Sequence, residues 1–269
     1  MASLDVASIP VVLLCGGKGT RIRDVSAELP KPMVPIGNFP IVWHIMNIYS
    51  RQGFRRFILC LGYKSEAFKQ FFLNYKAMTN DFTLDLGHPD SIKFHRAPNG
   101  REDMEWSVTL ADTGLETMTG GRIARVAKYI DTEFFMCTYG DGLADIDLKG
   151  LLKQHQESSK AVTLTGVRPP SRFGELVVEG ASVKEFSEKP QVSEGFINGG
   201  FMCMRKEFIS RYLKDDPGLI LEREPLVGAA KDGQLGMFTH KGFWQPMDTH
   251  REYIMLNEMW DSGKAPWVV

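Results

Sequence analysis

The sequence predicts an α/β protein in which helices flank a mixed, mainly parallel central sheet. Short apolar runs rich in β-branched residues alternate with longer segments whose apolar residues recur at helical spacing. Such an alternation is typical of parallel strands joined by right-handed crossovers. In the second half, short strand-like runs separated by Pro, Gly and Ser indicate a smaller antiparallel part. Because no repeat or linker divides the sequence, we expect a single domain over residues 1–269.

The first half carries the elements expected to form the parallel core. Residues 11–15 form a continuous apolar run, which suits a strand covered on both faces. Residues 76–105, which follow the helix expected at 65–75, are less regular than their flanks and contain one expected short strand, at 92–95. Further strands are expected at 57–61, 106–111 and 134–139, and helices at 41–49, 65–75 and 121–130.

The second half mixes helices with shorter strands. A helix at 146–156 and a strand at 161–167 continue the pattern of the first half. The remaining elements are expected as strands at 175–178, 183–186, 201–204 and 235–239, and as helices at 206–213, 225–231 and 249–260.

Composition and charge exclude several classes of protein. The 269 residues are 43% hydrophobic and 24% charged, which is typical of globular proteins and excludes intrinsic disorder. Lys and Arg total 32 against 33 for Asp and Glu, so no global charge favours nucleic acid or an anionic membrane. With no leader-like N-terminus and only short apolar runs, the sequence predicts a soluble cytoplasmic protein. The four cysteines form no C-x-x-C pair and are expected as buried thiols of a reducing compartment: Cys15, Cys60, Cys137 and Cys203.

A glycine-rich loop, residues 16–21, follows the first expected strand directly. Glycines let a backbone approach a phosphate closely, and successive N–H groups can form an anion-binding nest. The loop does not match a dinucleotide-binding motif, because Ile22 stands where the third glycine belongs. It does not match a P-loop either, since no Lys-Ser or Lys-Thr occurs in it.

Cationic side chains lie in or just after this loop. Lys18, Arg21 and Arg23 are followed by Lys31, which is held in an extended segment by a proline on either side. Arginine forks and lysine point charges together suit a clamp on a polyphosphate. The alternative is a surface loop with solvated cations. The place of the loop, at the carboxyl end of a parallel strand, favours ligand binding.

Two aspartates end other elements of the predicted fold. Asp141 lies between glycines after the strand at 134–139, and Asp248 precedes the last helix. Two carboxylates on one ligand face can hold Mg²⁺. The alternatives are that Asp141 forms a turn and that Asp248 is a helix N-cap. Their separation of 107 positions leaves their proximity open.

Three further polar residues lie near strand ends in the second half. Lys189 could neutralise a phosphate and Glu188 could accept hydrogen bonds from hydroxyl groups, although both also suit an exposed, salt-bridged turn. Asn198 precedes two glycines that allow a ligand to approach closely.

Taken together, these motifs resemble the sugar nucleotidyltransferase family. The matching stretches are Leu-Cys-Gly-Gly-Lys-Gly-Thr-Arg at 14–21, Pro-Lys-Pro-Met at 30–33, Tyr-Gly-Asp-Gly at 139–142, Glu-Lys-Pro at 188–190 and Trp-Gln-Pro-Met-Asp-Thr at 244–249. Cys15 stands where the family commonly has alanine. Further stretches are similar to the cytidylyltransferase branch of that family: residues 41–46, 108–114, 119–122, 197–201 and 263–267.

The resemblance implies a fold, a reaction and a cofactor. The fold would be the Rossmann-like nucleotidyltransferase fold, with residues 10–145 mainly binding nucleotide and 146–269 mainly binding sugar phosphate through the smaller antiparallel part. The reaction would transfer a cytidylyl group from CTP to α-D-glucose 1-phosphate with Mg²⁺, giving CDP-glucose and pyrophosphate. The family also implies a homo-oligomer, in this branch a hexamer. The alternatives are a sister nucleotidyltransferase with another nucleotide or acceptor, and a non-catalytic sugar-nucleotide-binding protein.

The resemblance also implies roles for single residues. Arg21 and Lys31 would be catalytic, holding the phosphates of CTP. Asp141 and Asp248 would bind Mg²⁺, whereas Glu188, Lys189 and Asn198 would bind the sugar phosphate. The implied nucleotide-binding set is Leu14, Gly16, Gly17, Gly19, Thr20, Arg21, Lys31, Thr113, Gly114 and Asp141.

Overall fold

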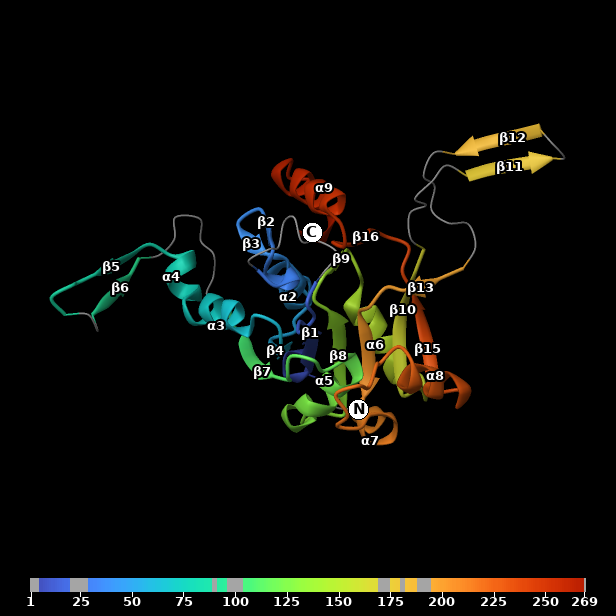
Figure 1. Ribbon diagram of the computed structural model, residues 1–269, viewed down its shortest axis with the longest axis horizontal. Helices are drawn as coiled ribbons and strands as arrows, with labels where there is room; N and C mark the ends of the chain where they lie inside the picture. Colours follow the sequence, from blue (N-terminus) through green and yellow to red (C-terminus); the bar gives the residue numbers. More distant parts are fainter. Residues whose placement is uncertain are drawn as a thin grey trace.

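The computed structural model describes residues 5–19, 29–88, 91–95, 104–168, 175–179, 182–187 and 195–268. Within these ranges, an eight-stranded sheet runs through the middle of the molecule in the order β13-β10-β14-β8-β1-β4-β7, with β15 paired to β10 (Figure 1). The sheet is mixed and mainly parallel, with four adjacent parallel strands from the first half of the chain, and helices lie on both of its faces. The predicted fold class is therefore confirmed.

The first half of the chain supplies four adjacent parallel strands. β1 lies at the centre, with β8 on one side and β4 on the other, and β7 follows β4 at the edge. The four strands, α2, α3 and α5 lie where the sequence predicts them, whereas α4 was not predicted, because its residues fall at the start of the stretch expected to be irregular. The strands are β1 (Pro10–Leu14), β4 (Arg56–Leu61), β7 (Ser107–Asp112) and β8 (Phe134–Tyr139), and the helices are α2 (Ile41–Arg51), α3 (Ser65–Leu73), α4 (Tyr75–Thr79) and α5 (Thr119–Val126).

The strands of the second half extend the same sheet. β14 is antiparallel to both β8 and β10, whereas β15 is parallel to β10. The strands are β10 (Val162–Val167), β13 (Ile197–Asn198), β14 (Met202–Arg205) and β15 (Leu235–Thr239), and the helices are α6 (Leu148–Glu157), α7 (Lys206–Tyr212), α8 (Glu224–Lys231) and α9 (His250–Asp261).

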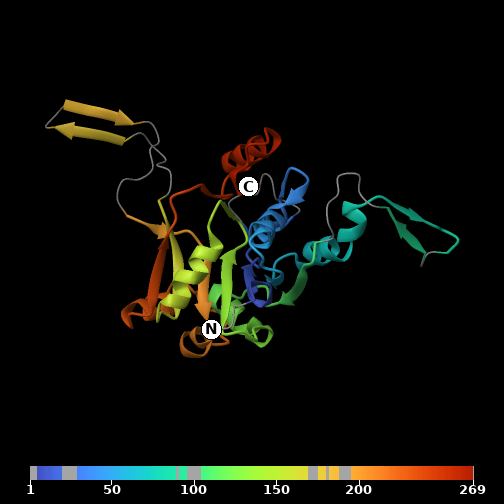
Figure 2. The same ribbon diagram turned by 180° about the vertical axis from the view of Figure 1, so that it is seen from behind.

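Among the residues that the structure describes, four small antiparallel pairs lie outside the main sheet. Two of them are hairpins that project from opposite sides of the molecule, as both views show (Figures 1 and 2). Most of their short strands are too brief to leave a periodic signal in the sequence. The pairs are β2 (Pro35–Ile36) with β3 (Phe39–Pro40), β5 (Phe82–Leu84) with β6 (Ile92–Phe94), β9 (Gly142–Ala144) with β16 (Trp244–Pro246), and β11 (Glu175–Glu179) with β12 (Ser182–Ser187).

The central strand β1 is buried on both faces. Val11 and Leu13 pack into the core on the α2 side, whereas Val12 and Leu14 pack into the core on the α5 side. Successive side chains of a strand point to opposite faces, so a strand between two helical layers needs apolar residues at every position. This explains why the first strand is a continuous apolar run.

The structure also bears on the cysteines and on membrane insertion. All four cysteines are buried and free, as predicted. Within the described ranges, no helix is both long and apolar enough to cross a membrane.

A buried histidine couples the stability of this fold to pH. His155 on α6 is fully buried, with Nδ1 at 2.8 Å from Thr163 Oγ1, and within the described residues its Nε2 has no hydrogen-bond partner. Burial, aided by the charge of Arg205, lowers the pKa of His155 from 6.5 to about 4. Between these two pH values the unfolded chain binds a proton that the folded chain does not. Stability is therefore lost as the pH falls through this window.

We expect this loss to depend on His155. Between pH 7 and pH 5, the free energy of unfolding should fall by about 2 kcal/mol more in the wild type than in His155→Gln. Urea unfolding at the two pH values measures the difference. His88→Gln is the matched control, because the His88 side chain is 82% exposed. A pH dependence that survives in His155→Gln would contradict the assignment.

Candidate active site

A cavity of about 310 Å³ opens where β1 and β8 end. Because these strands are adjacent and parallel, their carboxyl ends lie at the same edge of the sheet, which is where open α/β sheets bind ligands. The residues that line the cavity are Leu14, Cys15, Gly16, Gly17, Gly19, Lys31, Pro32, Thr117, Met118, Thr119, Arg122, Tyr139, Gly140, Asp141 and Asp248.

The predicted site residues fall into three groups. The first group lines this cavity: Leu14, Gly16, Gly17, Gly19, Lys31, Asp141 and Asp248. The second group, Thr113, Gly114 and Asn198, is described by the structure but is not among the lining residues. The third group lies outside the described residues and comprises Thr20, Arg21, Glu188 and Lys189.

Lys31 lies at the centre of the predicted residues. Its Nζ donates to Asp141 Oδ2 at 2.6 Å and to Asp248 Oδ1 at 2.7 Å. Burial alone would lower the pKa of Lys31, but the charges and hydrogen bonds of the two aspartates outweigh burial and raise it. Lys31 therefore stays protonated and faces two carboxylates in a largely buried setting.

The pairing of β9 with β16 brings the two aspartates together. Gly142 lies opposite Pro246 in this pair, and the backbone N–H of Met247 donates to the carbonyl oxygen of Asp141 at 2.9 Å. Asp141 and Asp248 each lie one step beyond these contacts. The pairing of these two strands thus brings Asp141 close to Asp248, although the two residues are 107 positions apart in the sequence.

Asp248 is not the N-cap of the last helix. Thr249 caps α9, with its Oγ1 accepting from the Glu252 N–H at 3.4 Å while Glu252 Oε2 accepts from the Thr249 N–H at 2.8 Å. The capping alternative for Asp248 is therefore wrong by one residue. The reason is that Thr249 and Glu252 have the capping-box spacing, and Asp248 instead bonds to Lys31.

The two carboxylates suit a hard divalent cation. Both already face one positive group, and Mg²⁺ takes one or two protein carboxylates together with water and substrate phosphates. Within the part of the chain that the structure describes, no group of three or more His, Cys, Asp or Glu side chains gathers at one point. A metal at Asp141 and Asp248 would accordingly be completed by water and phosphate oxygens.

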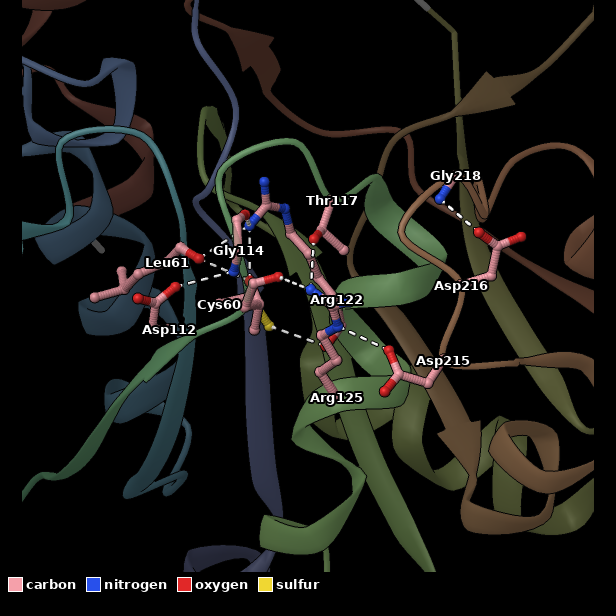
Figure 3. Close-up of polar contacts among 11 residues, drawn as sticks. Cys60, Leu61, Asp112, Gly114, Thr117, Arg122, Arg125, Asp215, Asp216 and Gly218 are labelled. Carbon is pink, nitrogen blue, oxygen red and sulfur yellow. Dashed lines mark hydrogen bonds and ion pairs between the residues drawn. The ribbon is translucent and has the colours of Figure 1, made fainter.

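Arg122, which the sequence analysis leaves without a role, organises the inner wall of the cavity. It is 4% exposed, and its Nη1 donates to Leu61 O at 2.9 Å, to Thr113 Oγ1 at 2.7 Å and to Gly114 O at 2.9 Å. Its Nη2 donates to Gly16 O at 3.0 Å. Figure 3 shows the Arg122 side chain beside Leu61 and Gly114. Thr113 and Gly114 therefore reach the cavity through Arg122.

A second arginine braces the same loop. Arg125 Nη1 donates to Thr113 O at 2.8 Å and to Thr117 Oγ1 at 2.7 Å, and its Nε pairs with Asp215 at 2.7 Å (Figure 3). The sequence did contain a signal for Arg122.

Arg122 lies one helical turn before Val126, on the apolar face of the amphipathic helix α5, where an unpaired arginine would not be tolerated.

Gly16 is required by the Arg122 guanidinium. A Cβ added at Gly16 would overlap this guanidinium, which Gly62 also approaches closely from the neighbouring strand end, whereas a Cβ at Gly17 would meet no atom within 4 Å. Gly16→Ala should therefore displace a buried, hydrogen-bonded charge. We expect it to lower the free energy of unfolding by about 3 kcal/mol, and Gly17→Ala to change it by less than about 0.5 kcal/mol.

Chemical denaturation of the two variants measures this contrast. Since both positions are glycines of one loop, effects on the flexibility of the unfolded chain are similar in both variants. Equal stabilities would mean that the packing of Arg122 against Gly16 contributes nothing.

The family model described as nucleotidyl transferase matches residues 10–259. The chain is 45% identical over 262 residues to the glucose-1-phosphate cytidylyltransferase of Salmonella typhi, covering 95% of this chain and 97% of that one. It is 43% identical to the probable glucose-1-phosphate cytidylyltransferase of Bacillus subtilis, covering 96% and 98% of the two chains.

The structural matches extend over nearly the whole fold. A putative glucose-1-phosphate thymidylyltransferase from Bacillus anthracis superposes with a TM-score of 0.67 at 14% identity, covering 94% of this chain and 95% of that one. The inositol-1-phosphate CTP transferase from T. maritima superposes with a TM-score of 0.62 at 17% identity, covering 94% and 96%. At these identities the likeness bears on the fold alone.

Proposed function

The chain belongs to the nucleotidyl transferase family, and on that premise we propose that it transfers a cytidylyl group from CTP to α-D-glucose 1-phosphate. The choice of substrates rests on relatives with 45% and 43% identity over nearly their full length. The observation in the molecule that carries the proposal is the convergence of Lys31, Asp141 and Asp248 on one cavity beside the glycine-rich loop.

The proposed reaction is a single in-line displacement. A phosphate oxygen of glucose 1-phosphate attacks the α-phosphorus of CTP, forming the new P–O bond of CDP-glucose. The bond from the α-phosphorus to the bridging oxygen of the β-phosphate breaks, and pyrophosphate leaves with the electron pair. No nucleophile of the protein is needed, so positioning and neutralisation of charge account for the acceleration.

Each charged residue of the site has a place in this scheme. Lys31 stabilises the charge on the α-phosphate, and Arg21 holds the β- and γ-phosphates that leave. Asp141 and Asp248 would hold Mg²⁺, which when bound neutralises charge on the phosphates. Lys189 takes the phosphate of the acceptor, whereas Glu188 and Asn198 contact its hydroxyl groups.

The residues expected to bind the nucleotide belong to the first half of the chain. Leu14, Gly16, Gly17 and Gly19 line the cavity and would contact the nucleotide, and Thr113 and Gly114 would act through Arg122. Thr20 belongs to this nucleotide-binding set on the resemblance alone. This agrees with the proposed division into a nucleotide part, residues 10–145, and a sugar-phosphate part, residues 146–269. Asp248 is then the point at which the second part reaches the metal.

We also propose that the protein is a cytoplasmic homo-oligomer, a hexamer as its resemblance implies. Apolar side chains on the β5–β6 hairpin support assembly, since Phe82, Leu84 and Ile92 are 44%, 41% and 48% exposed. Light scattering on the purified protein gives the mass directly. A monomer at micromolar concentration would contradict the proposal.

Release of pyrophosphate tests the activity. Four nucleoside triphosphates are combined with several sugar 1-phosphates, each with and without Mg²⁺. Release confined to CTP, glucose 1-phosphate and Mg²⁺ is the expected result. Release with another pair would retain the chemistry and refute the substrates. A folded protein that releases no pyrophosphate with any pair would refute the proposed transferase activity.

A further inference from the structure

Glu222 connects two walls of the cavity from outside. This residue lies just before α8, is exposed, and is not among the residues that line the cavity. Its Oε1 accepts a hydrogen bond from Tyr139 Oη at 2.5 Å, and its Oε2 accepts one from Thr119 Oγ1 at 2.8 Å. Tyr139 ends β8, Thr119 begins α5, and both line the cavity. One carboxylate thus ties a strand end to a helix start.

The backbone on both sides of this contact is fixed. The Met118 N–H donates to Pro217 O at 2.7 Å, and the Gly120 N–H donates to Leu219 O at 2.9 Å. The Leu221 N–H donates to Thr119 Oγ1 at 2.9 Å. With the bond from the Gly121 N–H to Leu219 O at 3.2 Å, four bonds join the start of α5 to the segment that precedes Glu222. The backbone beside Glu222 is therefore held in place, although the Glu222 side chain is exposed.

Tyr139 also holds Asn198 in place. Tyr139 Oη accepts a hydrogen bond from Asn198 Nδ2 at 3.2 Å, and Asn198 Oδ1 accepts one from the Gly200 N–H at 3.0 Å. The tyrosine ring packs against Gly200, where an added Cβ would lie 3.1 Å from Tyr139 Cδ2. The Asn198 amide is therefore held at both its oxygen and its nitrogen.

The direction of the hydrogen bonds depends on the carboxylate. A carboxylate only accepts, so it obliges the Tyr139 hydroxyl to donate to it, and the phenol oxygen is then left to accept from Asn198. The second N–H of the Asn198 amide can then serve a hydroxyl group of a ligand.

We propose that Glu222 is a positioning residue for the acceptor: it orients the Tyr139 hydroxyl, which orients the Asn198 amide toward the hydroxyl groups of the sugar phosphate. The inference rests on the proposed function, because it takes Asn198 to contact a sugar. Glu222 is then expected to affect the binding of the acceptor and not the binding of the nucleotide.

The test is steady-state kinetics of Glu222→Gln with glucose 1-phosphate and CTP varied separately. Glutamine has one acceptor oxygen, so it satisfies one hydroxyl and turns an N–H toward the other. We expect the KM for glucose 1-phosphate to rise about tenfold, the equivalent of one hydrogen bond, and the KM for CTP to change less than about twofold. Glu224→Gln is the control, because Glu224 is also exposed and lies only two positions along the chain.

Tyr139→Phe provides a second route that leaves the carboxylate in place. It should raise the KM for glucose 1-phosphate about as much as Glu222→Gln does, and the double variant should be no worse than either single variant. Coupled effects of this kind distinguish a relay through Tyr139 from two separate roles. Thermal unfolding of each variant confirms that the fold is retained.

Several outcomes would overturn the inference. They are an unchanged KM for glucose 1-phosphate in Glu222→Gln, an equal rise of both KM values, and effects that multiply in the double variant. If the wild type turns over CTP and glucose 1-phosphate while Glu222→Gln is normal, the inference alone fails. If the wild type does not turn over these substrates, the proposed function fails and the inference fails with it.

Discussion

Replacement of Lys31 by methionine is expected to lower the turnover number by about a thousandfold, the loss typical of removing one group that stabilises charge in a transition state. Lys31 presents its ammonium at the cavity, 2.6 Å from Asp141 and 2.7 Å from Asp248. Methionine keeps most of the length of the side chain but carries no charge. Among its described lining residues, the cavity would then keep only one basic side chain, that of Arg122.

The measurement is the turnover number at saturating CTP and glucose 1-phosphate, with circular dichroism as the check on folding. Lys149→Met is the matched control, because Lys149 is exposed on α6, remote from the cavity residues. Near-normal turnover in a folded Lys31→Met protein would remove Lys31 from the mechanism.

Replacement of Asp141 by asparagine should abolish most of the stimulation of turnover by Mg²⁺. The change is isosteric but removes one of two carboxylates that can hold the metal, and Asp248 alone then faces Lys31. We expect turnover at saturating Mg²⁺ to fall by about a thousandfold, since a metal contributes several kcal/mol of charge stabilisation.

A titration of turnover against Mg²⁺ separates loss of metal from loss of fold. With a chelator present, the wild type and Asp141→Asn should be similarly slow, because neither then holds the ion. Calorimetric titration should show weaker binding of Mg²⁺ to the variant. Asp261→Asn, at the exposed end of α9, is the control. An Asp141→Asn protein with the Mg²⁺ dependence of the wild type would exclude Asp141 as a ligand.

The sequence predicted the main sheet well because of what its strands require. β1, β4 and β8 are covered on both faces, so each needs a continuous apolar run, and a run of that kind is visible without a structure. Most helices were visible for a similar reason, since their buried apolar residues recur at helical spacing. The short helix α4 has no buried residue and was not predicted. The pairs β2–β3 and β9–β16 were missed, because strands of two or three residues have no period to detect.

The candidate site was predictable in its parts but not in its assembly. Lys31, Asp141 and Asp248 were identified by the motifs around them. The pairing of β9 with β16, which brings the two aspartates together beside Lys31, was not visible in the sequence. Arg122 and Glu222 were missed for different reasons. Arg122 acts from within a helix by contacts to backbone carbonyl groups, and Glu222 acts from the surface through the side chains of other residues.

The position of β14 has a consequence for how the chain assembles. β8 and β10 are consecutive members of the sheet along the sequence, but they do not pair with each other, because β14 lies between them. During synthesis, both strands leave the ribosome before β14. Until residues 202–205 are made, the backbone N–H and C=O groups on the facing edges of β8 and β10 have no strand to pair with. A fragment that ends before this strand would expose two open edges, which invite association with other chains. Truncation after β10 but before residue 202 should therefore yield aggregates rather than a smaller folded unit.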